Sequence, residues 1–210
     1  NMIQLERDIK AYNECVKQVK QINDSAQLRV LKGAQIVGFT TSGCAKYQTL
    51  LKALSPRVVI CEEAGEVLES HVLASLTSGT EQLILIGDHL QLRPKVTEYS
   101  LSKDSGNGYD LDISLFERLV NKYERQYRGR DLHKLGLLCT LNTQRRMRPP
   151  IADIIRGTLY PTLQDSDVVK KYPKLLGFVP DLWFFDHNWN ENTDMGEQSV
   201  SVRSYFNQKE

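Results

Sequence analysis

Two adjacent carboxylates follow a short apolar segment in the first third of this 210-residue chain. Glu62 and Glu63 come directly after residues 58–61, a run of Val, Val, Ile and Cys that predicts a strand. A carboxylate at the end of a strand can hold Mg²⁺ or act on a water molecule. The same pair would also suit the solvated start of a helix, where negative charge favours the helix dipole. The pair alone therefore leaves both interpretations open.

Two further predicted strands end in polar side chains. The apolar run 35–39 ends in Thr40 and Thr41, and the run 83–86 ends in a loop that contains Asp88 and Gln91. Taken alone, the threonines could cap a helix and the loop could be a simple turn. Polar groups at three consecutive strand ends favour a nucleoside triphosphatase, which needs a metal-binding carboxylate, a residue that acts on water, and cationic groups.

A basic segment later in the chain could supply the cationic groups. Gln144, Arg145 and Arg146 precede two prolines, which predict the first turn of a helix over residues 149–155. Arg146 could bring positive charge to a triphosphatase site from another domain, and the alternative interpretation of the segment is surface charge. Residues 124–134 are also rich in Arg, Lys and His, and we interpret them as a solvated face in preference to a nucleic-acid contact.

The three runs that carry the polar strand ends are predicted to form a parallel sheet. The runs are largely apolar and do not alternate with polar residues, which is typical of strands that are buried on both faces. The segments 44–54 and 66–77 are long enough to be the crossover helices that parallel strands require. Ligands of such sheets bind beyond the carboxyl ends of the strands, where these polar groups lie.

Two helices, a loop and two weaker strands complete the expected elements. Residues 2–24 place apolar side chains on one helix face, which suits an arm of a helical hairpin, a stalk, or a helix packed on the core. The polar segment 98–112 predicts an exposed loop, and Ser114 with Glu117 predicts a capping box at the start of the next helix. The runs 135–141 and 182–185 predict further strands. The apolar face of the first helix consists of Leu5, Ile9, Tyr12, Val16 and Val19.

The composition is ordinary for a soluble globular protein, with 40% apolar residues, 25% charged residues and a net charge of +1. This small charge neither favours nor excludes a nucleic-acid partner. No apolar run approaches the roughly 20 residues that span a bilayer, and residues 1–24 do not resemble a signal peptide, so we expect no membrane contact. The four cysteines, at positions 15, 44, 61 and 139, are far apart and favour free thiols over a zinc site or disulfides.

Several segments together resemble helicase motifs. Residues 87–94, GDHLQLRP, are similar to the Gly-Asp-x-x-Gln-Leu-x-Pro motif of superfamily 1 helicases, and residues 62–66, EEAGE, resemble their Walker B segment. Residues 144–149, QRRMRP, resemble the Gln-Tyr-Arg-Met-His-Pro motif that opens the second RecA-like domain. Residues 40–43, TTSG, resemble the strand-end motif that touches the nucleic-acid backbone. The combination resembles the up-frameshift type of RNA helicase, and within it the NFX-type zinc-finger-containing helicases.

The resemblance implies a fold and a division into domains. It implies an α/β, RecA-like P-loop NTPase fold with a parallel sheet flanked by helices, an incomplete first domain and the start of a second. Residues 1–32 would be a helical stalk or insertion arm, residues 33–140 the C-terminal part of the first RecA-like domain, and residues 141–210 the beginning of the second. The complete protein would be a cytoplasmic ATP-dependent helicase with ATP and Mg²⁺ as cofactors and RNA as its partner.

The resemblance also implies roles for individual residues. Glu63 would be the catalytic base, Glu62 the acid on the Mg²⁺ side, directly or through water, and Gln91 the residue that couples the γ-phosphate to domain closure. Arg146 would be the arginine finger. The remaining implied contacts are to the nucleotide, through Asp88, Gln144 and Arg145, and to RNA without sequence preference, through Thr40, Thr41 and Pro94.

The sequence departs from the family pattern at several positions. Glu62 stands where the family has aspartate, which keeps the charge and shifts the metal geometry. Arg145 stands where the family has the tyrosine that stacks on the base, and arginine can also stack on a flat ring. Glu66 replaces a glutamine and Arg148 replaces a histidine.

The phosphate-binding loop of the family is not found in this sequence. No G-x-x-x-x-G-K-[ST] occurs in the 210 residues, so we expect the chain alone not to hydrolyse ATP. Positions 204, 207 and 210 resemble a mid-domain family segment, and we expect a piece of a longer protein. The complete protein would be either a working motor or a catalytically decayed scaffold that binds RNA or protein. The presence of Glu63, Gln91 and Arg146 favours the motor.

Overall fold

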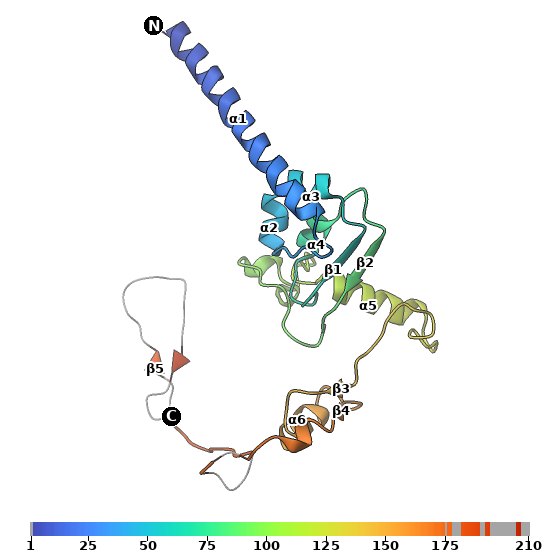
Figure 1. The fold of residues 1–210 in the computed structure, drawn as a ribbon. Coiled ribbons are helices and arrows are strands. Elements are labelled where there is room, and N and C mark those ends of the chain that lie inside the picture. Colours follow the sequence, from blue (N-terminus) through green and yellow to red (C-terminus); the bar gives the residue numbers. More distant parts are fainter. Residues whose placement is uncertain (1, 175, 178–181, 190–191, 194–204, 207–210) are drawn as a thin grey trace. The chain divides into compact units, whose positions relative to one another are not determined.

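The structure is a computed structural model that describes residues 2–174, 176–177, 182–189, 192–193 and 205–206 (Figure 1). The chain divides into two compact units, Asn1–Thr140 and Leu141–Glu210. Positions 204, 207 and 210, which carry a predicted family segment, lie outside the described residues. Among the helices that are described, none is both long and apolar enough to cross a membrane.

Helix α1 (Met2–Lys32) extends beyond the predicted segment 2–24. It contacts α3 (Gln48–Leu54), and its half-buried residues, Asp24, Leu28 and Leu31, all lie toward its C-terminal end (Figure 1). The apolar face that starts with Leu5 and Ile9 is exposed. The alternative in which this face packs on the core is therefore wrong, because the half-buried residues of the helix lie toward its C-terminal end.

The sheet of the first unit consists of two parallel strands, as predicted for residues 58–61 and 83–86. Strand β1 (Val58–Cys61) pairs with β2 (Gln82–Leu85) in a register that places Val58 opposite Gln82 and Cys61 opposite Leu85. Helix α4 (Glu69–Ser75) lies in the crossover between them, within the predicted segment 66–77. Helices α2 (Thr41–Lys46) and α3 precede β1 and cover most of the other predicted helical segment.

Two predictions about the sheet are wrong. The run 35–39 is not a strand in the described structure, since β1 and β2 pair only with each other and leave this run without a ladder partner. The strands are also not buried on both faces: Val58 and Ile60 are 49% and 58% exposed, whereas the alternate residues are half-buried. In the described chain, one face of this small sheet is covered and the other faces solvent.

The core of the first unit is made by residues of α2, α3, α4 and α5 (Leu115–Gln126) and of the turn after β1. Ser114 begins α5 as predicted, since its Oγ accepts a hydrogen bond from the Glu117 N–H at 3.1 Å. In a complete capping box the Glu117 carboxylate would also accept a hydrogen bond from the Ser114 N–H. Here that carboxylate pairs with Arg93 instead. The buried apolar residues of this core are Cys44, Leu50, Leu51, Ala64, Val72, Leu115 and Val120.

The remaining elements are short. The predicted loop 98–112 contains two 3-10 turns, η1 (Tyr99–Leu101) and η2 (Lys103–Ser105), while residues 135–141 and 182–185 form turns and coil and not the predicted strands. In the second unit, β3 (Thr143–Gln144) pairs in parallel with β4 (Gln164–Asp165), and α6 (Pro149–Arg156) begins on the predicted prolines. The second unit also contains η3 (Val169–Lys171) and the antiparallel pair β5 (Asn192–Thr193) and β6 (Tyr205–Phe206).

Candidate nucleotide and nucleic-acid site

The two adjacent glutamates occupy a tight turn directly after β1. The turn closes through a hydrogen bond from the Glu66 N–H to the Glu63 carbonyl oxygen at 2.9 Å. Glu62 and Glu63 are exposed, whereas the next residue, Ala64, is buried. Glu63 has a φ of +52°, a left-handed conformation that costs a non-glycine residue roughly 1–2 kcal/mol. Such strain is found more often at functional positions, so it agrees with a site at Glu63.

Two glycines bring the turn after β1 against the loop after β2. The Ala64 N–H donates to the Ile86 carbonyl oxygen at 2.8 Å, which joins the two segments. A Cβ atom on Gly65 would lie 2.4 Å from the Asp88 carbonyl oxygen, and one on Gly87 would lie 2.7 Å from the Gly65 nitrogen. The two backbones therefore approach more closely than any side chain would allow, and the glutamates lie beside the Gly-Asp loop.

The loop after β2 is organised by Asp88. Its Oδ1 accepts a hydrogen bond from the Leu90 N–H at 3.0 Å, and its Oδ2 accepts one from the Gln91 side-chain amide at 2.9 Å. The structure thus uses Asp88 to shape the loop and to hold Gln91. Gln91 itself is exposed, with its amide oxygen not engaged in this bond.

A largely buried ion pair ties the end of the same loop to α5. Arg93 Nε and Nη2 donate to the two carboxylate oxygens of Glu117 at 3.1 and 3.2 Å, and Lys103 Nζ lies 3.6 Å from that carboxylate. The Glu117 side chain is 6% exposed. The hydrogen bonds to Glu117 raise the pKa of Arg93 above its usual value. Pro94 next to it is buried, and its contact with RNA stays a prediction.

Thr40 and Thr41 lie at the start of α2. Thr40 is the N-cap, since its Oγ1 accepts a hydrogen bond from the Gly43 N–H at 3.0 Å, as the capping interpretation predicts. Thr40 is exposed and Thr41 is half-buried. The contact of Thr40 and Thr41 with nucleic acid stays a prediction.

In the second unit, the residues predicted to contact the nucleotide fall into two groups. Gln144 is 9% exposed and its side chain is fully engaged with the turn that follows it and with Asp165. Arg145 and Arg146 are exposed, and the Arg145 carbonyl oxygen accepts a hydrogen bond from the Tyr172 hydroxyl at 2.8 Å. Gln144 therefore shapes the turn, and the two arginines are the side chains that can reach a ligand.

Comparisons with known proteins agree with the motif resemblance. A family model described as "AAA domain" matches residues 2–98. NFX1-type zinc finger-containing protein 1 of Homo sapiens is 38% identical over 202 residues, which is 96% of this chain. The Schizosaccharomyces pombe protein "Helicase required for RNAi-mediated heterochromatin assembly 1" is 36% identical over 166 residues, or 79% of this chain and 15% of that protein. The Neurospora crassa regulator of nonsense transcripts 1 homolog is 28% identical over 201 residues, or 92% of this chain and 16% of that protein.

This chain belongs to the superfamily 1 helicases of the up-frameshift type. The NFX1-type relatives match it over nearly its whole length, while the chain spans about 9% of theirs. This helicase segment therefore corresponds to a small part of each of those proteins.

Sequence reasoning missed the residues that hold the helicase motifs in place. Gly65 and Gly87 carried a visible signal, since each glycine sits just beyond a predicted strand end. The Arg93–Glu117 pair and Asp165 carried none, because their partners lie 24 and 21 residues away along the chain.

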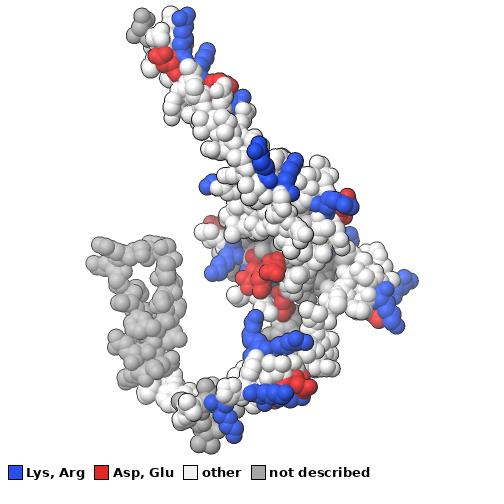
Figure 2. Space-filling view, in the orientation of Figure 1, with Lys and Arg blue, Asp and Glu red and all other residues white. Residues whose placement is uncertain are grey.

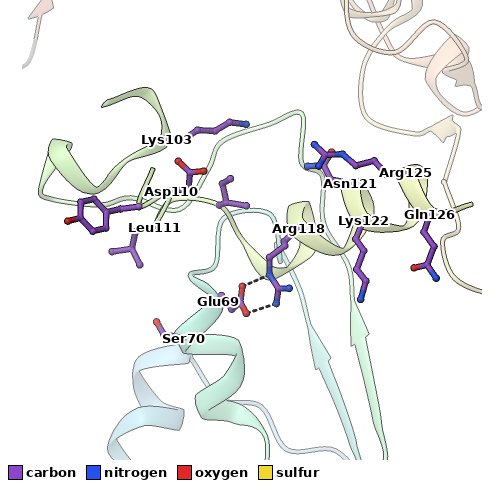
Figure 3. Close-up of a pocket in the computed structure, with 12 residues that line it drawn as sticks. Glu69, Ser70, Lys103, Asp110, Leu111, Arg118, Asn121, Lys122, Arg125 and Gln126 are labelled. Atoms are coloured by element: carbon purple, nitrogen blue, oxygen red, sulfur yellow. Dashed lines mark hydrogen bonds and ion pairs between the residues drawn. The ribbon is translucent and has the colours of Figure 1, made fainter. Parts of the chain in front are cut away.

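A hollow of about 990 Å³ lies elsewhere on the first unit of the helicase segment, between the loop 103–113, the start of α4 and one face of α5 (Figure 3). Arg118 on α5 forms a bidentate ion pair there with Glu69, at 2.6 and 2.8 Å. No residue predicted to act in catalysis lines it.

Figure 2 shows acidic side chains gathered on the visible face of the first unit and basic ones spread over both units and along α1.

Proposed function

We propose that this chain is part of an ATP-dependent RNA helicase and that the edge formed by residues 62–66 and 87–91 faces the terminal phosphates of ATP. The observation that carries the proposal is the backbone contact of Gly65 and Gly87, which brings the glutamate turn and the Gly-Asp loop to one end of two parallel strands. That end is the ligand-binding edge of open α/β sheets.

The residues at this edge fit a magnesium nucleotide. The Glu62 carboxylate is exposed and would offer Mg²⁺ an oxygen ligand, the kind this ion prefers, and Glu63 beside it is exposed as well. Mg²⁺ would neutralise charge on the β- and γ-phosphates. Glu62 would hold the metal, directly or through water, while Asp88 keeps the loop in shape.

Two neighbouring side chains are suited to the hydrolytic step. Glu63 can accept a proton from the attacking water, because its carboxylate is exposed at the turn and its backbone is fixed by the bond from Glu66. Gln91 donates a hydrogen bond from its amide nitrogen to Asp88, so its amide oxygen is available to the attacking water. If the bond to Asp88 is broken, the amide nitrogen would instead be available to the γ-phosphate.

Two exposed arginines have the cationic roles in this proposal. Arg146 would be the arginine finger, which stabilises charge that develops on the transferred phosphoryl group. Arg145 would stack on the adenine ring, since a guanidinium is planar. Thr40 and Thr41 would contact phosphates of the RNA, without reading its sequence.

The test is RNA-stimulated phosphate release by the complete natural protein that contains this segment. Glu63→Gln should lower kcat by at least about 10²-fold, the usual contribution of a general base, while the affinity for ATP changes little. Glu66→Gln is the matched control in the same turn and should retain turnover, since the Glu66 N–H that closes the turn is kept in the variant. Loss of ATP binding in Glu63→Gln would instead make Glu63 a structural residue.

The alternative function is a helicase-like scaffold. The observation that favours it is the departure from the family pattern at Glu62 and Arg145, both of which would contact the nucleotide. A wild-type protein that binds RNA but shows no phosphate release would establish this alternative.

A further inference from the structure

The side chain of Gln144 is buried between the turn that carries Arg146 and the neighbouring strand. Gln144 lies directly opposite Asp165 in the parallel pair of β3 and β4. Its Oε1 accepts hydrogen bonds from the backbone N–H groups of Arg146 and Met147 at 2.9 and 2.8 Å. Its Nε2 donates to the Met147 carbonyl oxygen and to Asp165 Oδ1, both at 2.7 Å. All four hydrogen-bonding positions of the amide are therefore used.

Only one orientation of this amide is compatible with Asp165. An ionised carboxylate accepts hydrogen bonds and donates none, so the amide nitrogen must face Asp165. The amide oxygen must then face the N–H groups of Arg146 and Met147. A flipped amide would set its oxygen against the carboxylate and its NH₂ against two N–H donors, leaving buried groups unpaired.

Arg156 holds Asp165 in turn. Its Nη2 donates to Asp165 Oδ1 at 2.9 Å, and its Nε donates to the Leu163 carbonyl oxygen at 2.8 Å. A further bond from Nη1 to Asp153 ties the guanidinium to α6. The Arg156 and Asp165 side chains are 25% and 13% exposed, so water competes only weakly for this pair.

We propose that Asp165 and Arg156 are positioning residues for Arg146, which set the turn 145–147 through the orientation of the Gln144 amide. This inference rests on the proposed function, in which Arg146 contacts the γ-phosphate. Asp165 and Arg156 take no part in the chemistry. They decide whether the backbone of Arg146 is held where its side chain can act.

The test is the kinetics of Asp165→Asn in the complete natural protein. An asparagine keeps the shape but presents both a donor and an acceptor, so it no longer enforces one orientation of Gln144. We expect kcat to fall about tenfold or more, since small displacements of a catalytic group can cost up to about 10²-fold, while KM for ATP stays within about twofold. Asp167→Asn is the matched control, because Asp167 is 85% exposed and pairs only with Lys170 among the described residues.

The decisive measurement is the same substitution in an Arg146→Ala background. If Asp165 acts through Arg146, Asp165→Asn should change the remaining kcat less than about twofold, because residues that act as a unit are not additive. An equal loss of kcat in both backgrounds would overturn the inference and make Asp165 a general structural residue. If Arg146→Ala itself leaves kcat unchanged, the finger assignment in the proposed function fails instead. Affinity for a transition-state analogue, ADP with aluminium fluoride, replaces kcat where turnover is too slow to measure.

Discussion

At the residue scale, the position of the candidate glutamates Glu62 and Glu63 depends on Gly65, which has no room for a side chain. Gly65→Ala would place a Cβ atom 2.4 Å from the Asp88 carbonyl oxygen, and backbone on both sides must move apart to relieve the contact. We expect the free energy of unfolding of the chain to fall by about 1–3 kcal/mol, as for other overpacked sites. Urea denaturation followed by circular dichroism measures the change.

Gly38→Ala is the control for this substitution. An added Cβ at Gly38 meets no atom within 4 Å, so its effect on stability should stay within about 0.5 kcal/mol. Equal effects at the two glycines would mean that the close approach of the two turns does not exist in solution.

Asp165 gives a pH dependence at the same scale. The hydrogen bond from Gln144, helped by Arg156, lowers the pKa of Asp165 from its ordinary value of 3.8 despite an opposing contribution from burial. A lowered folded-state pKa stabilises the fold at pH values above 3.8, and this stabilisation is lost as pH falls through the folded-state value. Asp165→Asn should therefore flatten the acid limb of the stability curve of the second unit. Titration of the Asp165 carboxyl carbon by NMR should give a midpoint below 3.8, and a midpoint above it would contradict the contact with Gln144.

The sequence predicted which residue types would gather but not how each is used. Glu62 and Glu63 lie at the strand end where the apolar run predicted them, because strand ends are marked locally. Gln144 has the chemistry of a ligand-binding side chain, yet its amide forms hydrogen bonds with its own turn and with Asp165. That use depends on a partner brought close by the pairing of β3 with β4, which no local pattern records.

At the element scale, the loop after β2 and helix α5 are held together by the pair Arg93–Glu117. Arg93→Met would leave a Glu117 carboxylate that is 6% exposed, with Lys103 at 3.6 Å as its remaining ion-pair partner among the described residues. Breaking one side of a buried pair leaves an uncompensated charge, and we expect a loss of about 3 kcal/mol in the free energy of unfolding.

Arg118→Met is the matched comparison, because Arg118 forms the same bidentate geometry with Glu69 between α5 and α4. The two side chains of that pair are 51% and 32% exposed, so its loss should cost no more than about 1 kcal/mol. Chemical denaturation of both variants beside the wild type compares the two pairs. A smaller loss for Arg93→Met than for Arg118→Met would contradict the role of burial.

Elements with local start signals were predicted well, and those inferred from apolar runs alone were not. Ser114 begins α5 and the prolines begin α6, since caps and proline act within one turn. The run 135–141 forms turns and coil, with Leu141 85% exposed. An apolar run becomes a strand only where another strand offers hydrogen bonds, and that partner is decided by tertiary structure.

At the scale of the whole molecule, the helicase assignment rests on the order of motifs in a chain that spans a small fraction of its relatives. The described sheet of the first unit has two strands, and one of its faces is exposed. The two strands nevertheless set the glutamate turn beside the Gly-Asp loop. The arrangement of residues 62–66 and 87–91 that is proposed to act on the water thus forms in a chain that contains no phosphate-binding loop motif.

This separation leads to a prediction for the chain by itself. The 210 residues contain no G-x-x-x-x-G-K-[ST], whose backbone N–H groups and lysine cradle the phosphates in this class of enzyme. We expect isothermal titration of the isolated chain with Mg²⁺ and ATP to show no saturable binding below a Kd of about 1 mM, and no RNA-stimulated phosphate release. The complete natural protein, titrated under the same conditions, should bind and turn over. Tight ATP binding by the isolated chain would contradict this prediction and mean that its phosphates are held by another set of donors, because the 210 residues contain no such loop.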